Sequence, residues 1–285
     1  TVWAWGQNDE GQLGDGTTTN KSKSVQISGL SDIRSVAVGD KHSLAVKANG
    51  SVWAWGNNGA GQLGTGNTVN STVPVEVNGL SNVIAIAANK SNSYALKNDG
   101  TVWSWGAMRT APVQMKELSG VSALVAAGES AFALKSDGTV WSWGDNSKKQ
   151  LGDGTTNSRT VAQPINGLNG ITQIAVSKVH GMALKSDGTV WKWGEAGSLT
   201  PAIPVQNTKI NNVRAIGAAD NKSLAVKKDG TVWVWDYYYA PEYPGTSVRY
   251  TDTPISIGGL TGVEIIAASS AMQIAAKDGS IWDGA

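Results

Sequence analysis

The residues best suited to catalysis or metal binding are few in this chain. It contains two histidines, His42 and His180, and no cysteine. Both histidines occupy the same place in a repeated segment, just before "SLAVK" and "GMALK", where other copies carry Ser, Ala or Met nearby. Such a position is typical of a turn-stabilising residue, and the lack of cysteine excludes disulfides and thiolate ligands. We therefore expect no metal site.

Carboxylates recur in the chain, but they recur at turn positions. The repeated ones are Asp15, Asp99, Asp137, Asp153, Asp187 and Asp229. Asp is common in turns because it tolerates positive φ and accepts local hydrogen bonds. No carboxylate pair, triad or His–carboxylate cluster stands out, so we predict no catalytic residues and no enzymatic activity.

Two glycine-rich loops invite comparison with phosphate-binding loops. "GQLG" stands at Gly11–Gly14 and again at Gly61–Gly64. A P-loop requires a following Lys-Ser/Thr at the start of a helix, whereas short β-type segments flank both loops here. We interpret them as close-packed turns between structural units, and expect no nucleotide and no other cofactor.

These residues lie within a repeat that runs the length of the chain. "TVWAWG" at Thr1 returns as "SVWAWG", "TVWSWG" twice, "TVWKWG", "TVWVWD" and finally "SIWDG". These seven copies hold all 13 tryptophans, and most begin about 50 residues apart, a spacing typical of repeat architectures. We expect the tryptophan pairs to pack one repeat against the next.

Each repeat predicts four short strands. In residues 33–78 they are "IRSVAVG", "HSLAVK", "SVWAWG" and "VPVEV". The second and third are joined by Asn-Gly or Asp-Gly, a strong hairpin signal for which we expect a type I′ turn. Four-stranded antiparallel units at this period indicate the blades of a β-propeller, and no helical period is present.

The pattern "V-W-x-W-G-x-N-x-x-G-Q-L-G-x-G", followed by "P-x-x-V", "G-L" and "V-x-x-I-A-x-G-x-x-H-S-x-A-L-K-x-D-G", resembles the repeat of the regulator of chromosome condensation family. The resemblance covers nearly the whole chain and is sharpest over residues 51–64. It implies an all-β propeller, commonly of seven blades. Family members include a nucleotide exchange factor, a plant photoreceptor and a secreted bacterial β-lactamase inhibitor; the tryptophan-rich, cysteine-free style looks most like bacterial members.

We predict a single propeller domain over residues 1–285 and favour six blades, with seven as the alternative. The first–second strand pair occurs six times, and the chain begins with a third strand. Six blades would close by joining residues 265–277 to residues 2–27 in one shared blade. "SIWDG" would then be a leftover or capping strand.

Function is expected where the repeats differ. The first–second turns and third–fourth loops should share one rim and vary most, and loops on a rigid scaffold are common binding sites. One such loop, "GAMRTAP", exposes Met108 and Arg109; another, "DYYYAPEYPGTSVRYTDTP", holds five of the six tyrosines. Tyrosine is enriched in binding hot spots. The predicted partner-binding residues are Tyr237, Tyr238, Tyr239, Tyr243, Arg249, Tyr250, Met108 and Arg109, with blade-edge capping by the tyrosines as the alternative.

The favoured function is a non-catalytic protein-binding module, such as a secreted inhibitor or recognition protein. The alternatives are a structural or adhesive repeat domain of a larger bacterial surface protein, and a carbohydrate-binding propeller. Net charge is +1, with 23 basic and 22 acidic residues, which argues against nucleic-acid binding. The longest apolar runs are too short to span a membrane. We expect the protein to be secreted or at the cell surface.

Overall fold

The computed structural model describes residues 1–194, 201–219, 222–238, 249–258, 260, 263–268, 272–276 and 281–284. All regular secondary structure in these ranges is β-strand. The described residues contain no helix that is long and apolar enough to cross a membrane. The chain forms two compact units, Thr1–Lys135 and Ser136–Ala285, each described below on its own. The prediction of a single domain stays a prediction.

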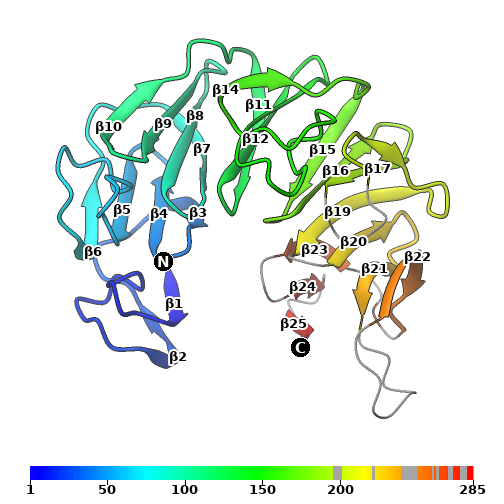
Figure 1. The fold of residues 1–285 in the computed structure, drawn as a ribbon. Coiled ribbons are helices and arrows are strands. Elements are labelled where there is room, and N and C mark those ends of the chain that lie inside the picture. Colours follow the sequence, from blue (N-terminus) through cyan, green and yellow to red (C-terminus); the bar gives the residue numbers. More distant parts are fainter. Residues whose placement is uncertain are drawn as a thin grey trace. The chain divides into compact units, whose positions relative to one another are not determined.

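Unit 1 contains the first three sheets (Figure 1). Sheet 1 is β1 (Trp3–Gly6) and β2 (Lys21–Gln26). Sheet 2 is β3 (Ile33–Val38), β4 (His42–Lys47), β5 (Val52–Gly56) and β6 (Ser71–Glu76). Sheet 3 is β7 (Val83–Ala88), β8 (Asn92–Lys97), β9 (Val102–Gly106) and β10 (Arg109–Gln114). The hairpin of β11 (Val121–Ala127) and β12 (Ser130–Lys135) ends the unit.

Unit 2 begins with the pair β13 (Val140–Gly144) and β14 (Arg159–Pro164). Sheet 5 is β15 (Ile171–Val176), β16 (His180–Lys185), β17 (Val190–Gly194) and β18 (Val205–Gln206). Sheet 6 is β19 (Val213–Ala219), β20 (Lys222–Lys227), β21 (Val232–Tyr238) and β22 (Arg249–Ser256). Sheet 7 is β23 (Val263–Ala268), β24 (Met272–Ala276) and β25 (Ile281–Gly284).

Within each four-stranded sheet, every strand pairs antiparallel with its neighbour in sequence, as the repeat predicts. The fourth strand is an edge of its sheet, and it contains a proline in β6, β10, β14 and β22. Proline cannot donate a backbone hydrogen bond, so it protects an edge from pairing with another chain.

The turn between the second and third strands differs from the predicted type I′ turn. Only the glycine has positive φ, 82° at Gly50 and 77° at Gly100. The Gly50 amide donates to the Lys47 carbonyl at 2.9 Å, which makes a three-residue loop, a type I turn followed by a glycine in the left-handed region. The preceding Asn49 or Asp99 side chain accepts the amide two residues on, so it does not need positive φ itself.

The apolar core lies between consecutive sheets of a unit. Leu44 and Val46 of sheet 2 pack in one cluster with Val83 and Ile86 of sheet 3. In unit 2, Met182 and Leu184 of sheet 5 pack with Val213, Ile216 and Trp235 of sheet 6. The second tryptophan of each pair is buried in this way, with Trp105 and Trp193 fully enclosed.

Trp3 and Trp5 are exceptions, because they are 53% and 55% exposed whereas Trp55 is 2% exposed. β1 pairs with β2, and the described residues of unit 1 include no first–second hairpin beside β1 like the one that covers β5 in sheet 2. The predicted blade shared by residues 265–277 and residues 2–27 is also not formed among the described residues. β24 carries β23 on one side and β25 on the other, so "SIWDG" supplies the third strand of sheet 7. A strand that follows β24 within a few residues closes a much smaller loop than the distant N-terminal strand would. The number of blades stays a prediction.

Candidate functional site

The two ends of each sheet differ in character, as the repeats indicate. At one end the Asn/Asp-Gly turn meets the entry into the next sheet: the Val83 amide at the start of sheet 3 donates to the Gly50 carbonyl of the sheet 2 turn at 3.3 Å. At the other end the third–fourth loop meets the first–second turn: the Asn57 amide donates to the Lys41 carbonyl at 2.8 Å. We call these the constant end and the variable end. The predicted binding loops belong to the variable end.

At the variable end, the "GQLG" loops fix one sheet to the next. The backbone oxygen of Gln62 accepts the Trp105 indole N–H at 2.8 Å and the Ser93 hydroxyl at 2.7 Å. Gln12 and Gln150 likewise accept from Trp55 and Trp193, at 2.9 and 2.7 Å. We refer to this bond between a glutamine carbonyl and the next sheet's tryptophan as the glutamine-carbonyl contact. It confirms that these loops are packing turns.

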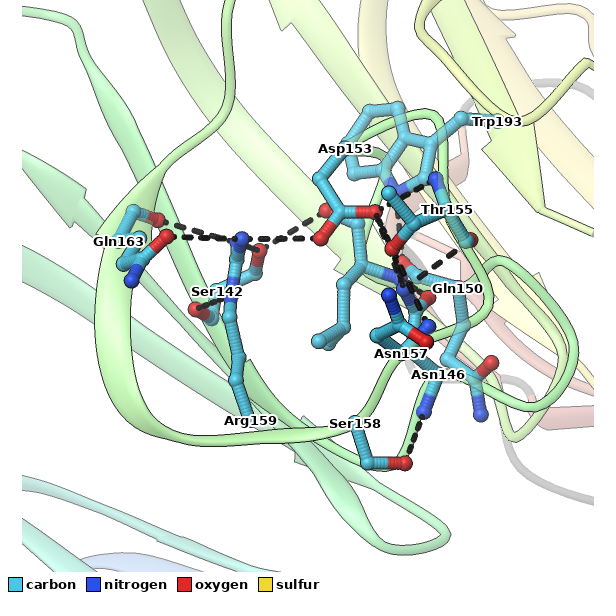
Figure 2. Close-up of polar contacts among 11 residues, drawn as sticks. Ser142, Asn146, Gln150, Asp153, Thr155, Asn157, Ser158, Arg159, Gln163 and Trp193 are labelled. Atoms are coloured by element: carbon cyan, nitrogen blue, oxygen red, sulfur yellow. Dashed lines mark hydrogen bonds and ion pairs between the residues drawn. The ribbon is translucent and has the colours of Figure 1, made fainter.

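Figure 2 shows how such a loop is held in unit 2. The Asn146 side chain donates to Asp153 and to the Thr155 carbonyl, at 3.0 and 3.1 Å, while its oxygen accepts the Leu151 amide. Arg159 forms an ion pair with Asp153 at 3.0 Å. Burial acts to raise the pKa of Asp153, but the hydrogen bonds from Thr155 and Asn146 and the Arg159 charge lower it overall. Asp153 therefore serves as a structural anion.

The remaining repeated carboxylates act in turns, as predicted. Asp99 accepts the amide and hydroxyl of Thr101 at 3.0 and 2.6 Å, and Asp187 accepts those of Thr189 at 2.9 and 2.7 Å. Asp137 and Asp229 make the same pair of bonds. In the ranges that the structure describes, no three His, Asp or Glu side chains gather where they could hold a metal ion.

The two histidines connect neighbouring sheets. His42 Nε2 lies 2.9 Å from the Ser93 hydroxyl, and His180 Nε2 lies 3.1 Å from the Ser223 hydroxyl. Burial lowers the pKa of His42 to about 4. Burial, with the nearby Lys192 charge, lowers the pKa of His180 to about 3. Both imidazoles are therefore neutral at pH 7 and act as inter-sheet hydrogen-bonding groups.

Met108 and Arg109 lie where the sequence places them, on an exposed turn of the variable end. Ala107 and Met108 have φ of 46° and 75°, which makes a two-residue hairpin turn from β9 into β10. Met108 is 77% exposed, and its amide donates to the Ala60 carbonyl of the preceding loop at 2.8 Å. The predicted exposure of this turn is confirmed.

The predicted tyrosine patch falls partly outside the described residues. Tyr239 and Tyr243 are not described. The backbone of the others forms the tip of the β21–β22 hairpin, where Tyr237 pairs with Tyr250 and Tyr238 pairs with Arg249. These four residues are thus brought together in unit 2, while Met108 and Arg109 belong to unit 1.

A buried ion pair in unit 2 was missed at the sequence level. Lys192 of β17 contacts Asp236 of β21, and both are buried, at 7% and 0% exposure. Asp236 also accepts the Ser223 hydroxyl. The signal was present in the sequence: among the six copies with two tryptophans, "TVWKWG" has Lys where the others have Ala, Ser or Val, and "TVWVWD" has Asp where the others have Gly.

Comparisons with known proteins agree on the fold. Yeast RCC1 (Prp20), in a crystal structure with Kap60, matches 98% of this chain and 77% of its own, at 22% identity and a TM-score of 0.84. Human WBSCR16 matches 98% of this chain and 86% of its own, at 18% identity and the same TM-score. The chain is thus similar in fold to the RCC1 β-propellers.

Sequence comparison gives a shorter but closer match. A zebrafish (Danio rerio) protein named Protein RCC2 homolog is 43% identical over 53 residues, which are 18% of this chain and 11% of that protein's length. The family model described as the RCC1-like domain matches residues 1–237, well over half of the chain. With its repeated four-stranded sheets and glutamine-carbonyl contacts, the chain belongs to the RCC1-like domain family.

Proposed function

We propose that this chain is a non-catalytic protein-binding module that uses the loops of its variable end. The observation that carries the proposal is the β21–β22 hairpin. In sheets 2 and 3 the third and fourth strands pair no further than the glycine, Gly56 with Ser71 and Gly106 with Arg109. In sheet 6 the pairing continues through Tyr237 and Tyr238 into a tyrosine-rich connection.

Two kinds of support favour a protein partner. Tyrosine gives large amphipathic contact at low entropy cost, and hot spots are rich in Tyr and Arg. Proteins of the same fold bind other proteins: yeast RCC1 (Prp20) was crystallised bound to Kap60, and Prp20p of Saccharomyces cerevisiae binds Gsp1p and histones. For this chain the partner is defined only by chemistry, as a protein surface that accepts aromatic side chains.

The setting we propose is extracellular, secreted or at the cell surface, as for an inhibitor or recognition protein. The Ser/Thr/Asn-rich, cysteine-free composition and the resemblance to bacterial members support it. Fractionation of the source organism with an antibody to the chain tests this setting, and recovery in the cytoplasm would contradict it.

The binding test compares the wild type with Tyr238→Ala/Tyr243→Ala as bait for proteins of the source organism. Candidate partners are the proteins that both the wild type and the control variant Val69→Ala retain. This control changes a 71% exposed side chain on another variable-end loop. We expect the tyrosine variant to lose about 2 kcal/mol or more of affinity for that protein, measured with the purified pair.

The melting temperature distinguishes binding from blade-edge capping. If the tyrosines bind, the variant melts close to the wild type. If they only cap the sheet, the variant melts lower and keeps its affinity, which would refute the proposal. Retention of the wild type on a glycan array, with no protein retained, would instead favour the carbohydrate-binding alternative.

A further inference from the structure

Among the described residues, the junction between sheets 5 and 6 shows no glutamine-carbonyl contact. The third–fourth connection of sheet 5 reads "GEAGSLTPAIP" and has no Gln-Leu-Gly. Correspondingly, Trp235 is 1% exposed, and its buried indole N–H has no hydrogen-bond partner among the described residues. The equivalent Trp105 and Trp193 both donate to a glutamine carbonyl. The described residues of this junction therefore differ from those that carry the glutamine-carbonyl contact.

The Lys192–Asp236 pair spans this same junction. Lys192 extends from the third strand of sheet 5, and Asp236 from the third strand of sheet 6. Ser223, whose counterpart Ser93 donates to the Gln62 carbonyl, donates to Asp236 instead and also lies 3.1 Å from His180. The Asp236 carboxylate thus accepts a hydrogen bond from a serine whose counterpart in sheet 3 donates to the third–fourth loop of sheet 2.

The two charges depend on each other because both are buried. A buried charge is tolerated when it is paired and hydrogen-bonded, and removing one partner leaves the other uncompensated. Neither residue follows the repeat. The third-strand residues equivalent to Lys192 are Ala4, Ala54, Ser104, Ser142, Val234 and Asp283, and none of them is a lysine. The pair is therefore a coordinated departure from the repeat in two neighbouring sheets.

Asp236 also stands where the backbone favours glycine. Its φ is 81°, against 99° at Gly56 and 90° at Gly194. A Cβ built on Gly56 would lie 2.6 Å from the Lys41 carbonyl oxygen, and one on Gly194 would lie 2.5 Å from the Val179 carbonyl oxygen. Non-glycine residues in such conformations store strain and persist only when surrounding contacts hold them. The ion pair and the Ser223 bond are those contacts.

The pairing of the third and fourth strands beyond Asp236 also differs from that in other sheets. After Gly144, as after Gly56 and Gly106, no further pairs join the third and fourth strands. After Asp236, which pairs with Thr251, two more pairs follow and carry the tyrosines of the hairpin tip. The substitution thus coincides with the base of the extended hairpin.

We propose that Lys192 and Asp236 are positioning residues that replace the glutamine-carbonyl contact between sheets 5 and 6 and hold the base of the extended β21–β22 hairpin. With the junction fixed from inside, the loops of these two sheets are free to diverge. The inference deepens the proposed function, on which it rests for the hairpin's role in binding.

The test uses three variants: Lys192→Ser, Asp236→Gly and the double variant. The double variant returns both positions to the residues of sheet 3, Ser104 and Gly106. Lys90→Ser is the control, because Lys90 is 60% exposed in its ion pair with Glu129. Each single variant should melt well below the wild type, the control should not, and the double variant should recover more than half of the larger loss.

The decisive measurement is backbone amide exchange in the intact protein. In the double variant, amides of 237–238 and 249–250 should exchange about tenfold faster than in the wild type, as when a strand end loses about one net hydrogen bond. Amides of β20 should keep their protection. A structural ion pair without a positioning role would leave the hairpin tip as protected as in the wild type.

Two results would overturn the inference. One is unchanged hairpin protection in the double variant; the other is a double variant that is unfolded or no more stable than the worse single variant. Neither measurement uses a binding partner. Failure here is therefore distinguishable from failure of the proposed function, which the tyrosine variant tests separately.

Discussion

Acidification should destabilise the protein through its two buried histidines, before its carboxylates titrate. Burial lowers the pKa of His42 to about 4, and burial with the Lys192 charge lowers that of His180 to about 3. An unfolded chain has histidine pKa values near 6.5. From about pH 6.5 down to these folded values, the unfolded state binds more protons, so stability falls as pH falls.

The size of the effect follows from the shifts. Between about pH 7 and about pH 5, each histidine should remove about 2 kcal/mol from the free energy of unfolding. Together they remove about 4 kcal/mol, a large part of the roughly 5–15 kcal/mol typical of a folded domain. The carboxylates contribute at lower pH. The pKa of Asp15, for example, is lowered from 3.8 to about 2, so its contribution is lost only below this window.

Urea denaturation at a series of pH values measures this slope. The matched control is His42→Asn/His180→Ser, which installs the residues that begin β8 and β12, Asn92 and Ser130. Its free energy of unfolding should be nearly constant from about pH 7 to about pH 5, and each single variant should lose about half of the wild-type slope. Equal slopes in the wild type and the double variant would refute the assignment of buried, neutral histidines.

Further outcomes follow from the repeat geometry. Gly56→Ala should destabilise by about 1–3 kcal/mol, because φ is 99° and the Cβ would lie 2.6 Å from a backbone oxygen, whereas the exposed Gly59→Ala should be nearly neutral in the same melting assay. Trp105→Phe should cost about 1 kcal/mol more than Trp235→Phe, because only the first loses a hydrogen bond, and equal losses would contradict this. Chelators and nucleotides should not shift the melting temperature; a shift of several degrees would indicate a site that the chain's chemistry does not predict. Deleting residues 1–28 should abolish cooperative melting if the chain is one domain, and a sharp, unchanged transition would disprove it.

Strand positions could be predicted from sequence because local signals determine them. Every described second strand from β4 to β20 ends at the lysine that the repeat marks, among them Lys47 and Lys227. The Asn/Asp-Gly pairs placed the hairpins correctly, although the turn type was wrong because the Asn or Asp side chain caps the turn without positive φ. Alternation and turn chemistry act over a few residues, so one repeat suffices to recognise them.

The partner of β24 could not be predicted in this way. Two copies of the same repeated segment, which form the strands Trp3–Gly6 and Ile281–Gly284, could each pair with it. Local propensity does not distinguish two such short strands from the same repeat, and loop closure favours the nearer one. The candidate binding residues were also chosen from loop composition alone. Composition identified the exposed Met108, but it contains no information about the buried contacts beneath a loop.

The Lys192–Asp236 pair shows which departures from a repeat are most informative. A tyrosine in a variable loop violates no constraint, so it can be gained or lost without compensation elsewhere. Asp236 replaces a glycine at positive φ, and Lys192 places a charge in a buried strand 44 residues away. Each substitution alone is unfavourable, and they become compatible only through their contact across two sheets. In a repeat protein, paired violations in neighbouring repeats, one of them at a glycine position with positive φ, therefore identify a junction that has been rebuilt, and here that junction lies at the base of the extended β21–β22 hairpin.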